Sequence, residues 1–176
     1  MSLYLIESSL KEVVSTKEEF NEKVSGLQTK LNENNSSLIE VQAAKDFSRV
    51  FFIVEGEDQN TASETVKGAG IPVELVKEVR LVGKELDEVK KNNNEVNYLV
   101  EWNIPSEITM DQYLARKKKN SVHYAEVPEV AFSRTYVCED MTKCLCFYDA
   151  PDEAAVKRAR EAVQTPIDSI TELAGE

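Results

Sequence analysis

Hydrophobic and polar residues follow each other along this chain in a pattern that predicts strands and helices in a fixed order. The first half contains four segments with the alternation typical of strands, at residues 3–8, 38–44, 50–55 and 73–82. Two segments with helical spacing lie between them, at residues 17–32 and 58–69. The order β-α-β-β-α-β is that of a ferredoxin-like unit, in which both helices cover one face of an antiparallel sheet.

Polar residues mark where the predicted helices begin. Ser15 and Glu18 have the spacing of a capping box, so we expect Ser15 to cap the first helix. Asp58 suits the N-cap of the second helix. In the other half of the chain, Thr109 and Gln112 again have capping-box spacing and predict a helix that starts there.

The second half of the chain repeats the first. Asp140 follows Asp46 by 94 residues, and Glu101 follows Glu7 by the same offset. The register holds without a gap from the first strand to the last, which predicts two copies of one unit. In the second copy we expect strands at 97–102, 132–138, 144–148 and 168–173, and helices starting at Thr109 and at 152–163.

The repeat also predicts the domain organisation. Residues 1–82 form the first ferredoxin-like repeat, 83–96 a charged and asparagine-rich linker, and 97–176 the second repeat. The central strands at 50–54 and 144–148 are apolar on both faces, which favours sheets that are covered on both sides. We therefore predict an α+β fold in which the two βαββαβ repeats pack sheet to sheet as a fused dimeric α+β barrel. This internal pseudo-dimer could associate further into a homodimer.

The composition is acidic. The 176 residues include 21 Lys and Arg and 32 Asp and Glu, which gives a net charge of −11. We therefore expect no nucleic-acid and no membrane partner. Three cysteines and an N-terminus without the pattern of a signal peptide favour a cytoplasmic location. No apolar run approaches the roughly 20 residues that a membrane-spanning helix requires.

Three segments of the second repeat carry a family likeness. They are residues 136–140 (Tyr-Val-Cys-Glu-Asp), 146–156 (Cys-Phe-Tyr-Asp-Ala-Pro-Asp-Glu-Ala-Ala-Val) and 166–170 (Pro-Ile-Asp-Ser-Ile). Their order and spacing resemble the small bacterial nickel-binding-protein-like domain family, and residues 67–73 show a weaker version in the first repeat. The resemblance implies a ferredoxin-like α+β fold that pairs into barrels and, for some members, binding of nickel. Members often carry a histidine in the second helix, where this chain has Thr65 and Ala159.

Three cysteines in the second repeat are a first candidate for metal chemistry. Cys144 and Cys146 lie on one face of a predicted strand, and Cys138 lies across the turn. Their counterparts in the first repeat are apolar: Ala44, Val50 and Phe52. The repeat therefore favours three small core residues over a thiolate metal site.

Two acidic residues at matching positions are a second candidate. Glu7 and Glu101 lie on the first strand of each repeat and, if these sides face the barrel, could bind a divalent cation such as nickel or share a proton. His123, the single histidine, could join them as a ligand. If the same sides face solvent, the two acids are ordinary charges at the edge of a sheet.

A third group could line a barrel cavity. Arg134, Tyr136 and Tyr148 alternate on the predicted hairpin and could meet Glu101 there, with Trp102 beside them. An Arg–Glu pair inside a barrel also explains part of this group without a ligand.

These residues support three classes of function. The first is a non-enzymatic cytoplasmic binding protein for a metal ion, nickel among them, or for a small molecule. The alternative is a cofactor-independent enzyme of the α+β barrel type, a monooxygenase or isomerase, acting on a small organic molecule in the barrel cavity. The third is an interaction module without a ligand. A single histidine and the absence of a glycine-rich phosphate loop argue against triad hydrolases and nucleotide-dependent enzymes.

Overall fold

The computed structural model describes residues 1–92 and 95–174, which form two compact units. Unit 1 comprises Met1–Val79 together with Val89–Lys91, and unit 2 comprises Arg80–Glu88 together with the chain from Asn92 onward. The predicted linker, residues 83–96, lies partly outside the described residues, and its described part contains a short helix, α3 (Leu86–Lys91). No helix within the described residues has the length and apolar character needed to cross a bilayer.

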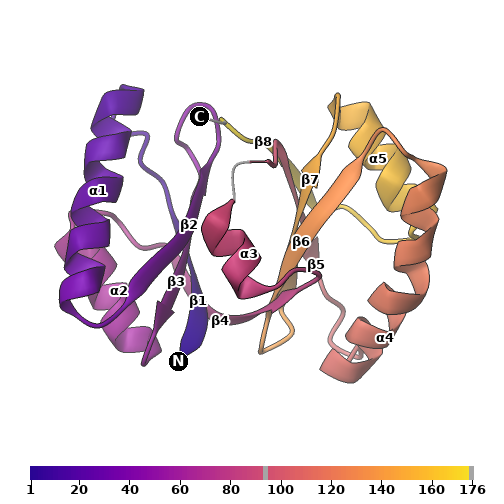
Figure 1. The fold of residues 1–176 in the computed structure, drawn as a ribbon, viewed down its shortest axis with the longest axis horizontal. Coiled ribbons are helices and arrows are strands. Elements are labelled where there is room, and N and C mark those ends of the chain that lie inside the picture. The colour runs from indigo at the N-terminus through magenta and orange to yellow at the C-terminus, as the bar shows by residue number, and fades with distance from the viewer. Residues whose placement is uncertain (93–94, 175–176) are drawn as a thin grey trace. The chain divides into compact units, whose positions relative to one another are not determined.

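Unit 1 has the element order that the sequence predicts. Its elements are β1 (Ser2–Ser8), α1 (Lys17–Glu33), β2 (Ser37–Ala43), β3 (Val50–Gly56), α2 (Gln59–Gly68) and β4 (Leu75–Val82), of which the last three residues are counted with unit 2. The strands lie in the order β2-β3-β1-β4 with antiparallel pairing throughout. In Figure 1, α1 and α2 lie on the same side of these strands.

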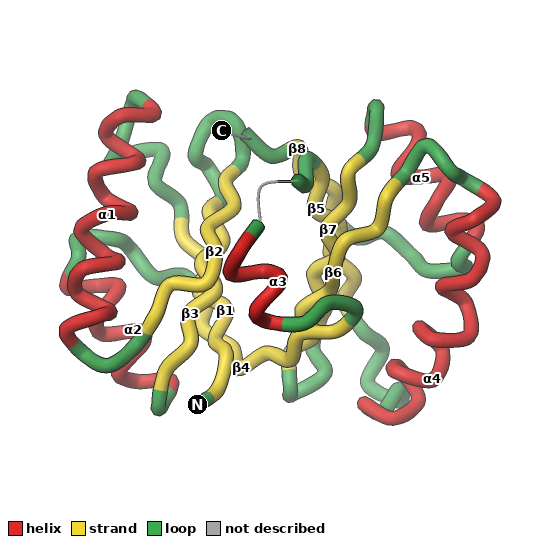
Figure 2. The backbone as a smooth tube through the Cα atoms, viewed as in Figure 1, coloured by secondary structure: helices red, strands yellow, loops and turns green. Residues whose placement is uncertain are grey.

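Unit 2 has the same order. Its elements are β5 (Tyr98–Asn103), α4 (Met110–Asn120), the 3-10 helix η1 (Ser121–Glu126), β6 (Ala131–Cys138), β7 (Lys143–Asp149), α5 (Glu153–Ala162) and β8 (Ser169–Glu172). The strand order is β6-β7-β5-β8, and α4 and α5 lie on one side of the strands, as Figure 2 shows. The α+β class and the two βαββαβ units are thus confirmed.

Local contacts repeat at the predicted offset of 94 residues. The carboxylates of Asp58 and Asp152 accept a hydrogen bond from the third residue of the helix that each one caps, at 2.7 and 2.8 Å. In the hairpin turns, Phe47 and Met141 have φ angles of 61° and 63°. The repeat in the sequence is therefore a repeat of backbone geometry as well.

The first helix begins at Lys17, as predicted, but its N-cap lies one residue after the predicted cap, Ser15. Thr16, not Ser15, accepts the hydrogen bond from the backbone N–H of Glu19, at 3.1 Å. The hydroxyl of Ser15 donates to the Glu19 carboxylate at 2.8 Å. Ser15 therefore supports the capping residue. The capping box of Thr109 and Gln112 is confirmed.

Each unit has its own apolar core between its sheet and its helices. In unit 1, Ile6, Phe52 and Val66 are fully buried in this core, as are Leu27 and Leu31 of α1. The corresponding core of unit 2 is built around Val100, Val137 and Val156. Burial of these apolar side chains is the main source of stability for units of this size.

Candidate functional site

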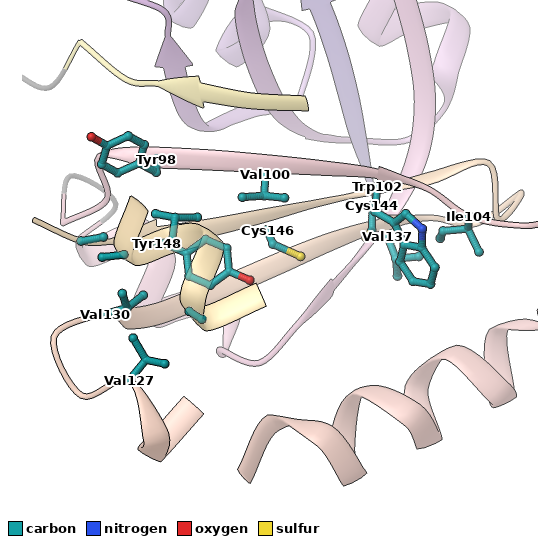
Figure 3. Packing of buried hydrophobic residues seen from close by; sticks show 14 of the residues in the cluster. Tyr98, Val100, Trp102, Ile104, Val127, Val130, Val137, Cys144, Cys146 and Tyr148 are labelled. Atoms are coloured by element: carbon teal, nitrogen blue, oxygen red, sulfur yellow. The ribbon is translucent and has the colours of Figure 1, made fainter. Parts of the chain in front are cut away.

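The core of unit 2 contains polar side chains at positions that are apolar in unit 1. Alternate residues of β7 point toward the helices, which places Cys144, Cys146 and Tyr148 on one side of the sheet (Figure 3). The buried face of α5 includes Ala155, Val156, Ala159 and Arg160. The helical period thus directs Arg160 into the core, where it is only 2% exposed.

Arg160 has few hydrogen-bond partners. Its Nη1 donates to the hydroxyl of Tyr148 at 3.0 Å, and its Nη2 donates to the carbonyl of Pro166 at 2.7 Å. Its Nε is buried and has no partner among residues 1–92 and 95–174. The N–H of Arg160 Nε is therefore a buried donor without an acceptor in the described part of the chain.

The tyrosines next to Arg160 are neutral. The hydroxyls of Tyr124, from η1, and Tyr148 lie 2.6 Å apart. Burial raises the pKa of Tyr124 to about 12 and raises that of Tyr148 well above its usual value. Both phenols stay protonated near pH 7, so neither balances the charge of Arg160.

Two thiols complete the polar group. The S–H of Cys144 donates to Cys146 Sγ, which lowers the pKa of Cys146 and raises that of Cys144. The hydroxyl of Thr135 also donates to Cys146 Sγ, at 3.2 Å. Cys138 is buried as well, and burial raises the pKa of its thiol. All three cysteines are free, and the prediction that they occupy core positions is confirmed.

A small pocket opens beside this polar group, and we call it the unit 2 pocket. It measures about 20 Å³ and is lined by Trp102, Tyr113, Arg116, Lys117, Asn120, Ser121, Tyr124, Cys144, Cys146, Arg160, Val163 and Thr165. A single water needs about 10–15 Å³, and pockets for drug-sized molecules measure about 300–1,000 Å³. The unit 2 pocket therefore has room for one very small occupant.

Aromatic rings hold the basic residues at this pocket. The guanidinium of Arg116 lies 5.5 Å from the centre of the Trp102 ring, and Lys117 Nζ lies 4.3 Å from that of Phe132. Together with Arg160 they make three cations, and no carboxylate belongs to the described lining. The pocket is thus positive although the chain is acidic.

Unit 1 provides an internal comparison. At the positions that correspond to Cys144, Cys146, Tyr148 and Arg160, it has Val50, Phe52, Val54 and Val66. All four are fully buried in the apolar core of unit 1. The same backbone therefore folds with an apolar core, and the polar group is not needed for the fold.

The two matching acids, Glu7 and Glu101, each pair with a base in their own unit. Glu7 accepts a hydrogen bond from Arg49 Nη2 at 2.9 Å, and Glu101 accepts one from Lys143 Nζ at 2.8 Å. Arg49 and Lys143 also correspond at the 94-residue offset. A repeated ion pair explains why an acid stands at this place twice.

His123 belongs to η1, where its Nδ1 lies 2.6 Å from the carboxylate of Glu126. Its side chain is 47% exposed, whereas that of Glu101 is 6% exposed. Among the described residues, no group of three or more His, Cys, Asp or Glu side chains could hold a metal ion. Thr65 and Ala159, where the resembling family often has histidine, lie on the buried faces of α2 and α5.

The structure separates the residues that were predicted to line one cavity. Arg134 and Tyr136 pair with Phe147 and Leu145, on the face of the sheet turned away from the helices. Tyr148 and Trp102 point to the helices. Arg134 lies opposite Phe147, and side chains alternate along β7, so Tyr148 lies on the other face. The β-bulge between Phe132 and Arg134 brings Phe132, but not Arg134, to the face of Tyr148.

On the face turned away from the helices, Arg134 interacts with its neighbours in the sheet. Its Nη1 donates to the hydroxyl of Ser133 at 2.8 Å, and its guanidinium lies 5.2 Å from the centre of the Phe147 ring. Tyr136 makes an edge contact with the same ring, at 6.1 Å. Packing within unit 2 thus accounts for much of the environment of both side chains.

Arg160 and Tyr124 were not among the residues singled out from the sequence. The signal for Arg160 was present: it stands in the buried stripe of a helix, and its repeat partner is Val66. A basic residue at a position that is apolar in the other repeat is a more specific pointer than an acid that occurs in both.

Comparison with known proteins places residues 98–173 in a family model described as Nickel responsive protein SCO4226-like. These residues form most of unit 2 and include the polar group. The likeness inferred from the sequence is thus confirmed for this part of the chain. No curated protein matches the chain in sequence.

Two solved structures show the same fold over nearly the whole chain. A candidate chlorite dismutase, TA0507, has a TM-score of 0.58 at 12% identity and covers 98% of this chain and 95% of its own. A candidate monooxygenase from Lactobacillus acidophilus NCFM has a TM-score of 0.53 at 12% identity and covers 98% and 93%. At this identity the likeness concerns the fold alone.

Proposed function

We propose that this chain is a non-enzymatic binding protein for a small ligand, and that its ligand site is the unit 2 pocket. The observation that carries the proposal is the difference between the two units. Where unit 1 has Val54 and Val66, unit 2 has Tyr148 and Arg160. Polar groups in a core are costly, so their presence in one unit alone supports a role other than folding.

The matched family is described as nickel responsive, which supports a role in the handling of nickel. At the unit 2 pocket itself, Arg116, Lys117 and Arg160 oppose a bare cation. The geometry there favours a neutral or anionic small molecule, and nickel held by Glu7, Glu101 or His123 is the competing form of the proposal.

The enzyme alternative has less support. The likeness to a candidate monooxygenase extends to the fold alone, and the unit 2 pocket, at about 20 Å³, is far smaller than pockets for drug-sized molecules, which measure about 300–1,000 Å³. We therefore favour binding over catalysis.

The test is a ligand panel observed by amide chemical shifts of the full chain. Chloride, bromide and methanol are titrated separately, and we expect at least one to shift the amides of Lys117, Tyr124 and Thr165 in a saturable way. Cys146→Phe, which introduces the residue that unit 1 has, should fill the pocket and abolish these shifts. The amides around Phe52 serve as the reference within the same molecule.

Nickel is tested by elemental analysis after desalting, on the native chain and on Glu7→Gln/Glu101→Gln. Nickel that is retained by the native chain and lost from the double variant would move the site to the paired acids. That result, or a panel in which no ligand shifts the pocket amides, would contradict the proposal.

A further inference from the structure

Arg160 brings a positive charge into the interior of unit 2 without an acidic partner. It is 2% exposed, and its hydrogen bonds go to Tyr148 and to the carbonyl of Pro166, both neutral. Across residues 1–92 and 95–174, no Asp or Glu forms an ion pair with it. Arginine keeps its proton even when buried, and a buried charge is strongly destabilising unless it is balanced.

Free donors point to where the balancing group belongs. Arg160 Nε is buried without a partner, and Arg160 lines the unit 2 pocket. Tyr124 and Tyr148 share one hydrogen bond, so one of the two hydroxyl protons is left to be donated elsewhere. Because Tyr124 also lines the pocket, an acceptor placed there could take up both unused donors.

Size and charge narrow the class of occupant. About 20 Å³ admits a group of roughly the size of one water, which is too little for phosphate or sulfate. The lining includes Arg116 and Lys117 in addition to Arg160, so the potential in the pocket favours negative charge.

We propose that the ligand of the unit 2 pocket is a small monovalent anion of halide size, which accepts a hydrogen bond from Arg160 Nε and balances the buried guanidinium. The inference rests on the proposed function, since it names the ligand class of the same site. A hydrogen bond from a charged donor in a desolvated pocket is among the stronger ones that a protein can offer an anion.

Cys146 is the competing source of negative charge. Hydrogen bonds from Cys144 and Thr135 converge on its sulfur, and it lines the same pocket. As a thiolate it would balance Arg160 from within the chain and repel a bound anion. The experiment must therefore separate an internal anion from an external one.

The experiment measures the ³⁵Cl NMR line width of chloride in a solution of the full chain at pH 7. Sodium chloride is added to a sodium gluconate buffer, and the ionic strength is kept constant. We expect saturable excess broadening that sodium bromide removes by competition. Arg160→Met should weaken the apparent affinity at least tenfold. Arg158→Met is the matched control, because Arg158 lies on the same helix but is exposed and paired with Glu129 at 3.0 Å.

A second variant protects the test if Arg160→Met does not fold. Lys117→Gln removes one positive charge from the pocket lining and should weaken chloride binding several-fold. Each variant is accepted only if its amide spectrum keeps the dispersion of the native chain.

Three results would overturn the inference. Equal broadening in the native chain and in Arg160→Met would place the anion elsewhere. Broadening that occurs only in Cys146→Ala would show that the Cys146 thiolate balances Arg160. If chloride and bromide fail while methanol shifts the pocket amides, the anion inference falls and the proposed binding function stands.

Discussion

Arg160 shows what a repeat reveals about a single residue. The helical period predicts that its position is buried, and Val66 shows what a purely structural residue looks like there. Hydropathy alone places arginine at the surface and gives no sign that this one is 2% exposed. Only the combination of helical period and repeat partner would have identified it before the structure.

The two matching acids show that a repeated residue can have a purely structural explanation. Glu7 and Glu101 were candidates for a ligand site because they occur twice, yet Arg49 and Lys143 occur twice with them. Two charges that recur as a pair are explained by each other. Repetition of a residue is thus informative only after its neighbours have been aligned in the same way.

We predict that the two ion pairs contribute unequally to stability. The side chains of Glu101 and Lys143 are 6% and 15% exposed, whereas those of Glu7 and Arg49 are 12% and 37% exposed. Glu101→Gln should therefore lower the free energy of unfolding by about 3 kcal/mol, and Glu7→Gln by about 1 kcal/mol. Urea unfolding at pH 7 measures both, and a larger loss in Glu7→Gln would contradict this reasoning.

At the scale of elements, the hairpins explain both a success and a failure of sequence reasoning. Asp46 and Asp140 are residue types that favour turns, and both carboxylates accept hydrogen bonds from the backbone N–H two residues on, at 3.0 and 3.1 Å. The bulges after Leu38 and Phe132 also correspond at the 94-residue offset, but they were missed. One extra residue in a strand changes which face each later side chain occupies. In β6 the residues from Arg134 onward are buried on both faces, so the pattern of polar and apolar residues does not reveal this change.

The turn after β2 offers a test of pH dependence. The hydroxyl and then the backbone N–H of Ser48 donate to Asp46, which lowers the pKa of this carboxyl below its usual value. Its contribution to stability is therefore complete above the pKa of the unfolded chain and is lost as the pH falls through the lower, folded value.

We expect Ser48→Ala to raise the pKa of Asp46 toward its usual value, as followed by carboxyl-carbon NMR. Lys11→Ala should raise it less, because Lys11 lies 3.9 Å away and both side chains are more than half exposed. A larger effect from Lys11→Ala would mean that charge, not hydrogen bonding, sets this pKa.

For the whole molecule, the sequence predicted the order of elements and the two units because periodic patterns extend over many residues. It did not predict α3, which forms from the charged segment Leu86–Lys91, since so short a helix has almost no periodic signal. The unit 2 pocket was out of reach for another reason. It depends on side chains from α4, η1, β7 and α5 that only the tertiary fold brings together.

The two apolar cores have no residue in common, which leads to a prediction for local stability. Leu27→Ala should remove about 3 kcal/mol from unit 1, because Leu27 is fully buried there. Hydrogen exchange should then show a larger loss of amide protection in β3 than in β7. Val156→Ala in unit 2 should give the reverse order. Equal losses in both strands would mean that the chain unfolds as one cooperative body.

The net charge of −11 and the positive pocket act over different distances. Exposed charges are screened beyond roughly 10 Å at 0.1 M salt, so the acidic surface as a whole weakly affects a site whose three cations are in contact with the pocket. An acidic protein can therefore keep a local site for anions, while the same acidic surface still disfavours nucleic acid.

The single tryptophan of the chain forms part of the pocket wall. Trp102 is 4% exposed and lies beneath the guanidinium of Arg116. Tryptophan fluorescence, excited at a wavelength that only indole absorbs, therefore comes from unit 2 alone. Trp102 is thus an intrinsic fluorescent probe in the wall of the pocket whose occupancy is to be tested. Ligand binding and the unfolding of one half can both be followed without attaching a dye.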